Sequence, residues 1–197
     1  MANANSIYHA KSAAPLANPT AASVFLTQDS VTSNAASSST PTKAAVIYLP
    51  EVEVDSVNLG NNAGVKWPLG TVAYTVHLVG RASAGTSGTF AVAVQIGSST
   101  TAGNNTTLFT ATAQTYNLLG NYQVILNLTY DPTSKLLSGS AKSAGGTTEA
   151  LQIEVAMTSQ TVDLSLGKQA LCVTGIFGTS NASNIGYLDD FTLEVVG

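Results

Sequence analysis

Residues 122–131 read YQVILNLTYD and place an apolar side chain at every second position. Tyr122, Val124, Leu126, Leu128 and Tyr130 share one parity, and mostly polar residues lie between them. Successive side chains of a β-strand point to opposite faces of its sheet. The stretch therefore predicts a strand with one face in an apolar core.

The same alternation recurs along most of the chain after residue 44. It is present in TVAYTVHLVG (71–80), TFAVAVQIG (89–97), EALQIEVAM (149–157), TVDLSL (161–166) and GYLDDFTLEVV (186–196). Clusters of Gly, Asn, Asp and Ser separate these segments, and helical spacing is missing. About nine or ten short strands favour two packed antiparallel sheets. We predict an all-β, antiparallel two-sheet jelly-roll sandwich with an extended N-terminal arm, because an immunoglobulin-like sandwich has fewer strands and a Cys…Trp…Cys pattern.

Residues 1–43 differ from the rest, since they are mainly Ala, Ser, Thr and Asn with scattered Pro. Their one apolar cluster is SVFLT (23–27). This composition predicts an extended low-complexity arm, 1–43, followed by a jelly-roll domain, 44–197. A polar arm orders by lying on another surface, so we expect Val24, Phe25 and Leu26 to contact a partner.

The composition excludes several classes of function. Only 9 % of the residues are charged, Lys and Arg together number 7, and the net charge is −4. A basic footprint for nucleic acid or an anionic membrane is therefore missing. No apolar run approaches the roughly 20 residues of a membrane span, and the N-terminus lacks the apolar core of a signal peptide. A surface with few ions loses little hydration free energy when it contacts another protein. This property fits a protein that works inside an assembly, and it fits a secreted domain with a neutral surface equally well.

No constellation for catalysis is evident, and we predict that the chain is not an enzyme. His9 lies in the arm and His77 alternates outward, so neither is placed for a serine triad. Cys172 lies in the apolar run QALCVTGIFG and is expected to be a buried, inert thiol. Asp189 and Asp190 are adjacent, so they are expected to point to opposite faces of a strand and cannot form a facing catalytic pair.

The stretch PEVEVDSVN (50–58) places three carboxylates on one face of an expected strand. Glu51, Glu53 and Asp55 repel one another unless water, lysines or a cation intervene. Two interpretations stay open here. One is a charged strand face that discourages pairing between sheets, and the other is a calcium site.

Asp189 has the same parity as Phe191, Leu193 and Val195 in the last apolar run. If those three residues face the core, Asp189 points inward at the start of the strand. A buried carboxylate must be paired, hydrogen-bonded or metal-bound. Asp190 has the opposite parity and is expected to face solvent.

The segment YLDDFTLEVV (187–196) resembles the last strand of many jelly-roll carbohydrate-binding modules. In those families an aspartate at this place often holds a structural calcium with oxygens from an early strand. The resemblance implies Asp189 or Asp190 as a ligand, with Glu51 or Glu53 as companions. It also implies exposed aromatic sugar platforms, for which Trp67 in VKWPLG is the candidate; its other interpretation is a loop anchor before Pro68.

A second resemblance covers more of the chain. The Ala/Ser/Thr-rich arm, the low-charge sandwich and the ending LCVTGIFGTSNASNIGYLDDFTLEVV (171–196) resemble small virion proteins of tailed phages. Capsid decoration, or cement, proteins have this character. The resemblance implies a non-enzymatic structural protein on the outer capsid surface of the virion, made in the host cytoplasm without a signal peptide. Its partners would be the major capsid protein and sister copies, with a trimer favoured.

The sequence thus leaves two functions. The first is a phage capsid decoration protein that binds and stabilises the shell, with no cofactor other than a structural calcium at Asp189, Glu51 and Glu53. The alternative is a carbohydrate-binding jelly-roll module, free or displayed on a virion, that uses Trp67. A coat protein that builds the shell itself is disfavoured, because the arm is not basic.

Overall fold

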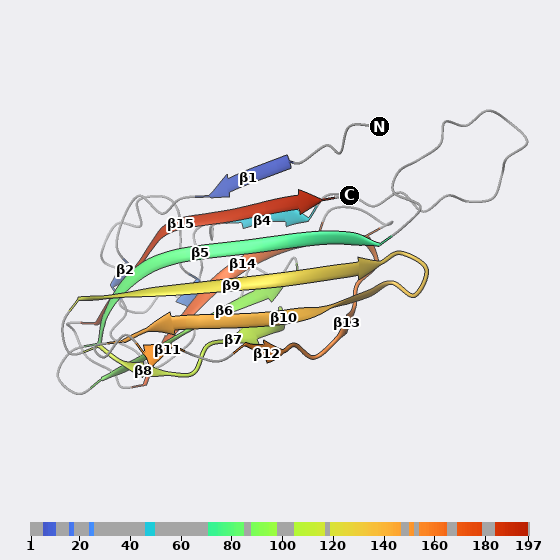
Figure 1. The fold of residues 1–197 in the computed structure, drawn as a ribbon. Helices are drawn as coiled ribbons and strands as arrows, with labels where there is room; N and C mark the ends of the chain where they lie inside the picture. The colour runs from blue at the N-terminus through green and yellow to red at the C-terminus, as the bar shows by residue number, and fades with distance from the viewer. Residues whose placement is uncertain are drawn as a thin grey trace, which may run out of the picture.

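The computed structural model describes most of the chain from residue 71 onward and four short segments before it. The described residues are 6–10, 16–17, 24–25, 46–49, 71–84, 88–97, 105–116, 119–146, 150–151, 154–164, 169–178 and 184–196. They form strands that pair antiparallel in two sheets (Figure 1). The predicted all-β, two-sheet jelly-roll sandwich is confirmed.

The larger sheet has nine strands among the described residues, and its centre is made of four long ones. These are β15 (Asn184–Val196), β5 (Val72–Ala84), β9 (Gly120–Asp131) and β10 (Leu136–Gly145), in that spatial order. β1 (Ser6–Ala10) and β2 (Leu16–Ala17) pair with β15 at one edge. At the other edge β10 pairs with three two-residue strands, β11 (Ala150–Leu151), β12 (Val155–Ala156) and β13 (Gln160–Thr161).

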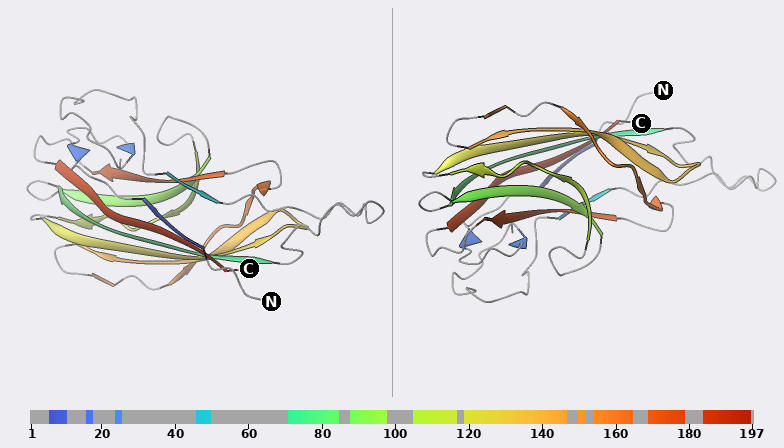
Figure 2. Two further views of the ribbon diagram at one scale, coloured as in Figure 1. Left: turned by 90° about the horizontal axis from the view of Figure 1, so that it is seen from above. Right: turned by 90° about the horizontal axis from the view of Figure 1, so that it is seen from below.

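The smaller sheet has six described strands and lies over the larger one (Figure 2). Its two central strands are β14 (Gln169–Phe177) and β6 (Thr89–Ile96). β3 (Val24–Phe25) and β4 (Val46–Leu49) pair with β14, whereas β7 (Thr106–Thr110) and β8 (Gln114–Thr115) pair with β6. The chain changes sheet between β2 and β3, β4 and β5, β5 and β6, β8 and β9, β13 and β14, and β14 and β15, so each sheet contains distant parts of the sequence.

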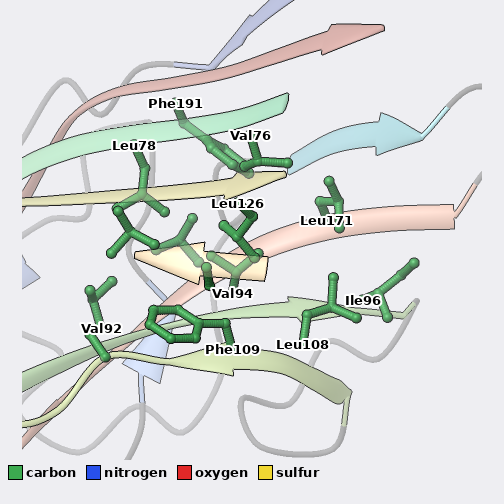
Figure 3. Packing of buried hydrophobic residues seen from close by; sticks show 14 of the residues in the cluster. Val76, Leu78, Val92, Val94, Ile96, Leu108, Phe109, Leu126, Leu171 and Phe191 are labelled. Atoms are coloured by element: carbon green, nitrogen blue, oxygen red, sulfur yellow. The ribbon is translucent and has the colours of Figure 1, made fainter. Parts of the chain in front are cut away.

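The core lies between the sheets and consists of the residues that the alternation places inward. Side chains from β5, β9 and β15 meet side chains from β6, β7 and β14 there (Figure 3). The labelled members are Val76, Leu78, Val92, Val94, Ile96, Leu108, Phe109, Leu126, Leu171 and Phe191. Burial of these apolar side chains is the main favourable term in folding, and it sets the register of each long strand.

One end of the core is aromatic. The Phe90 ring lies 4.9 Å from that of Phe177, 5.5 Å from that of Tyr122 and 5.8 Å from that of Tyr116, measured between centroids. Tyr116 and Phe90 meet edge to face at 85°, an arrangement that the ring quadrupoles favour. This cluster lies between the sheets: Phe90 and Phe177 come from β6 and β14 of the smaller sheet, and Tyr122 comes from β9 of the larger one.

The prediction of one strand over EALQIEVAM is wrong. The segment contributes the short strands β11 and β12, and Val155 in β12 is 48 % exposed. Its described residues follow the outer edge of β10, where Val155 is exposed while Met157, of the same parity, packs against the core, so a strict period of two is not kept there.

The arm boundary at residues 43 and 44 lies outside the described residues and stays a prediction. Within 1–43, the described segments β1, β2 and β3 are edge strands of the chain's own sheets. The described residues include no helix long and apolar enough to cross a membrane.

Candidate functional site on the outer face of the large sheet

A β-bulge interrupts β15 where the two adjacent aspartates stand. Leu188 pairs with Gly80 and Asp190 pairs with Val79, so Asp189 is an extra residue with no counterpart in β5. Leu188 is 1 % exposed and Phe191 is 0 % exposed, although three positions separate them. A bulge inserts one residue into a strand and redirects side chains locally.

The bulge turns Asp189 away from the core, so the prediction that it points inward is wrong. Arg81 on β5 donates from Nε to Asp189 Oδ2 at 2.8 Å and from Nη2 to Oδ1 at 2.7 Å. Arg81 lies on the outer face, the face of the larger sheet that points away from the smaller one, because it alternates with buried Gly80 and Ala82. Asp189 still finds a partner, as a carboxylate must, but on the surface of the sheet.

Asp190 also belongs to the outer face, as predicted. Its Oδ2 accepts a hydrogen bond of 3.0 Å from Thr192 Oγ1. The two aspartates therefore do not alternate across the sheet. The one sequence signal for this was the spacing of Leu188 and Phe191, two core residues three positions apart in a strand that otherwise repeats every two.

A buried tyrosine holds the bulge from the inner side. The Tyr122 hydroxyl donates to the carbonyl oxygen of Tyr187 at 2.6 Å. Burial raises the pKa of Tyr122 well above its ordinary value, which keeps the hydroxyl protonated and able to donate. Gly80 leaves room for this bond, because a Cβ there would stand 2.1 Å from Tyr187 O and 2.3 Å from Tyr122 Oη.

Arg81 has a second contact on the outer face. Its Cζ atom lies 4.4 Å from the centroid of the Tyr187 ring, within the range of a cation–π interaction. The Arg81 and Asp189 side chains are 39 % and 35 % exposed, so this ion pair is open to solvent. Tyr187 is half-buried.

Exposed amides lie on the neighbouring strand. On β9, Asn121 pairs with Arg81 and Gln123 pairs with Val79, so both share the outer face, and both are exposed. A hydrogen bond of 2.7 Å joins Gln123 Nε2 to Nε2 of His77, which faces outward as predicted. We call the following group the bulge patch: Arg81, Asn121, Tyr187, Asp189 and Asp190.

Several predicted site residues cannot be placed. Glu51, Glu53, Trp67 and Leu26 lie outside the described residues. Val24 and Phe25 form β3, whose main chain pairs with Gly175 and Thr174 of β14. The calcium site and the sugar platform at Trp67 thus stay predictions. Among the residues that are described, no group of three His, Cys, Asp or Glu side chains could hold a metal ion.

Cys172 is buried on β14, as predicted, and its environment favours the protonated thiol. Burial raises the pKa of its thiol to about 11, although a hydrogen bond from Asn105 Nδ2 at 3.7 Å opposes this effect. The thiolate is the nucleophilic form of cysteine, and this thiol stays protonated at neutral pH.

Comparisons with known proteins do not assign a family. No family model and no curated protein matches the chain. Similar solved structures include winged bean acidic lectin complexed with methyl-α-D-galactose, with a TM-score of 0.36 and 11 % identity over 98 % of this chain and 99 % of that one. Another is arcelin-5, a lectin-like defence protein from Phaseolus vulgaris, with a TM-score of 0.37 and 9 % identity over 97 % and 98 %. Peanut lectin with a 9mer peptide has a TM-score of 0.36 and 10 % identity over 98 % and 97 %. Likenesses this distant carry no argument about function.

Proposed function

We propose that this chain is a non-enzymatic carbohydrate-binding protein that holds a sugar on the bulge patch. The observation that carries the proposal is the grouping of one ring, one fixed guanidinium–carboxylate pair and an exposed amide on adjacent strands. Tyr187, Arg81 and Asn121 stand side by side in register across β15, β5 and β9.

The hydrogen-bonding capacity of these groups matches a polyol. Each oxygen of Asp189 accepts one bond from Arg81 and keeps lone pairs for hydroxyl donors. Arg81 has five N–H donors in all, and the two bonds to Asp189 leave others for hydroxyl oxygens. The Asn121 amide offers both a donor and an acceptor. Sugar hydroxyls likewise donate and accept, so vicinal hydroxyls can bridge such groups.

The patch is also preorganised. Its members stand on long paired strands, and the Tyr122–Tyr187 hydrogen bond fixes the bulge that presents Asp189. A site that is already ordered avoids most of the entropy lost when flexible groups bind a ligand. The half-buried ring of Tyr187, against which the Arg81 guanidinium packs, adds apolar surface beside the polar groups, as small-ligand sites commonly combine them.

A printed array of neutral and acidic glycans tests the proposal, with hits measured by titration calorimetry. We expect Arg81→Ala and Asp189→Ala to weaken binding at least about tenfold, since each removes a central polar contact. Lys142→Ala is the matched control, because it removes an exposed cation of the same sheet at β10, outside the bulge patch. Absence of binding to every glycan, or equal loss in all three variants, contradicts the proposal.

A second candidate is the capsid decoration protein that the sequence resembles, and it concerns the segments β1, β2 and β3. Segments of the expected arm add to sheet edges through main-chain hydrogen bonds. The same edge pairing can join an arm to a neighbouring copy or to another protein. In this role the chain would sit on the outer capsid surface of a virion, bound to the major capsid protein and to sister copies, as a trimer.

Cosedimentation with assembled particles tests this second candidate. We expect the full chain to sediment with the particles and a variant without residues 1–43 to stay in the supernatant. Circular dichroism of the shortened variant checks that its sheets are retained. Equal sedimentation of both chains contradicts a clamping role for the arm.

A further inference from the structure

We infer that the bulge patch accepts neutral sugars and discriminates against anionic ones such as uronic acids, sialic acids and sulfated sugars. This inference rests on the proposed carbohydrate binding and names the ligand class of that site. It follows from how the one guanidinium of the patch is occupied and from the carboxylates around it.

One pair of N–H donors of Arg81, the fork formed by Nε and Nη2, is already engaged by Asp189. Carboxylates and sulfates are usually gripped by two parallel N–H groups of a guanidinium. In Arg81, Nε and Nη2 form this fork, and both donate to Asp189. The Tyr187 ring lies 4.4 Å from Cζ and covers one planar face of the same group. An anionic sugar could reach only the remaining N–H groups of Nη1 and Nη2, on a guanidinium whose charge Asp189 already compensates, whereas a hydroxyl needs only one of these groups and no unpaired positive charge.

The local charge also disfavours an anion. The patch has one guanidinium and two carboxylates, Asp189 and Asp190, so it carries a net negative charge. Glu194 adds a further carboxylate on the same outer face of β15, at the position that pairs with Thr75. Lys142 is the described lysine of this face and lies two strands away from β5, on β10. An anion therefore meets repulsion and receives little compensation for its lost hydration.

A neutral vicinal diol meets neither obstacle. One hydroxyl can donate to Asp189 while its neighbour accepts from Arg81 or Asn121, and no ion pair is broken. The engaged guanidinium and the repulsive carboxylates weaken the binding of anionic sugars, while the hydrogen bonds favour neutral ones. Specific sites commonly use both kinds of effect.

The experiment compares glycans that differ only in charge. The probe is a printed array in which each neutral oligosaccharide has a sialylated, sulfated or uronic-acid counterpart. We expect neutral members to bind at least about fivefold more tightly than their anionic counterparts at low salt, and the ratio to shrink in ~1 M NaCl, where the Debye length is about 3 Å.

Asp190→Asn isolates the charge. The amide oxygen can still accept the bond from Thr192, while one repulsive charge is lost. We expect this variant to bind anionic counterparts several-fold more tightly than the wild type does at low salt, so that the ratio of neutral to anionic affinity falls. Lys142→Ala serves as the control and should leave neutral binding unchanged.

The outcomes separate the two proposals. Tighter binding of anionic counterparts by the wild type, or no change in Asp190→Asn, overturns the ligand class while carbohydrate binding stands. Binding to no glycan overturns both.

Discussion

The Tyr122 hydroxyl reaches from the aromatic end of the core to the carbonyl oxygen of Tyr187, 2.6 Å away, at the entrance to the β15 bulge. This bond connects the interior to the outer face, because Tyr122 also packs against Phe90. Two residues after Tyr187, the chain presents Asp189 to Arg81. The geometry of the bulge patch therefore depends on a contact that lies beneath the sheet.

Gly80→Ala tests whether that contact needs a residue without a side chain. The new Cβ would stand 2.1 Å from Tyr187 O, and only a backbone shift can relieve this. We expect a loss of about 2–3 kcal/mol in the free energy of unfolding, the usual cost of overpacking. Urea denaturation measures it.

Gly178→Ala is the control for this substitution. A Cβ at Gly178 meets the Thr89 Oγ1 atom at 2.2 Å, but that atom belongs to a side chain and can rotate away. The loss should be well under that of Gly80→Ala. Equal losses in the two variants would show that the bulge tolerates a side chain at residue 80.

Tyr122→Phe and Tyr74→Phe make a matched pair. Both remove one buried hydroxyl, but Tyr122 donates to Tyr187 whereas the Tyr74 hydroxyl has no hydrogen-bond partner among the described residues. A buried acceptor that loses its donor costs about 1–3 kcal/mol, while removal of an unsatisfied group is neutral or stabilising. We expect Tyr122→Phe to lower the urea midpoint and Tyr74→Phe to leave or raise it. The reverse order would be incompatible with this account of the bulge.

The sequence predicts the fold of this protein well because burial imposes a period of two wherever a strand covers the core. Val76, Leu126 and Phe191 all lie inside for that reason. The same rule fails at β12, an edge strand in which Val155 is exposed and does not contact the core. Alternation of apolar and polar residues therefore indicates that a strand contacts the core. It says little about a strand that does not contact the core.

The candidate site was harder to predict, for two physical reasons. A bulge reverses parity at one residue, so Asp189 was assigned to the wrong face although its need for a partner was recognised. The partner itself, Arg81, is 108 residues away in the chain, and alternation does not say which strands pair. Only the pairing of β15 with β5 and of β5 with β9 brings Arg81 to Tyr187 and Asn121.

The Arg81–Asp189 ion pair should contribute little to stability despite its two hydrogen bonds. Its side chains are 39 % and 35 % exposed, and exposed pairs contribute about 0.2–1 kcal/mol. A double-mutant cycle with Arg81→Met and Asp189→Asn should give a coupling energy in that range, reduced in high salt. A coupling above about 2 kcal/mol that salt leaves unchanged would mean that the pair is structural and not available to a ligand.

Cys172 should make the protein sensitive to alkaline pH. Burial raises the pKa of the folded-state thiol from 9.0 to about 11, so the unfolded chain loses this proton first. The contribution to stability is complete below pH 9 and is lost as the pH rises to about 11. At about 1.4 kcal/mol per pKa unit, the wild type should lose about 2–3 kcal/mol relative to Cys172→Ala over this window. Urea denaturation of both proteins between pH 7 and pH 11 measures the difference, and tyrosine ionisation cancels because it is common to both. Parallel pH profiles would show that the thiol is not held in its protonated form by burial.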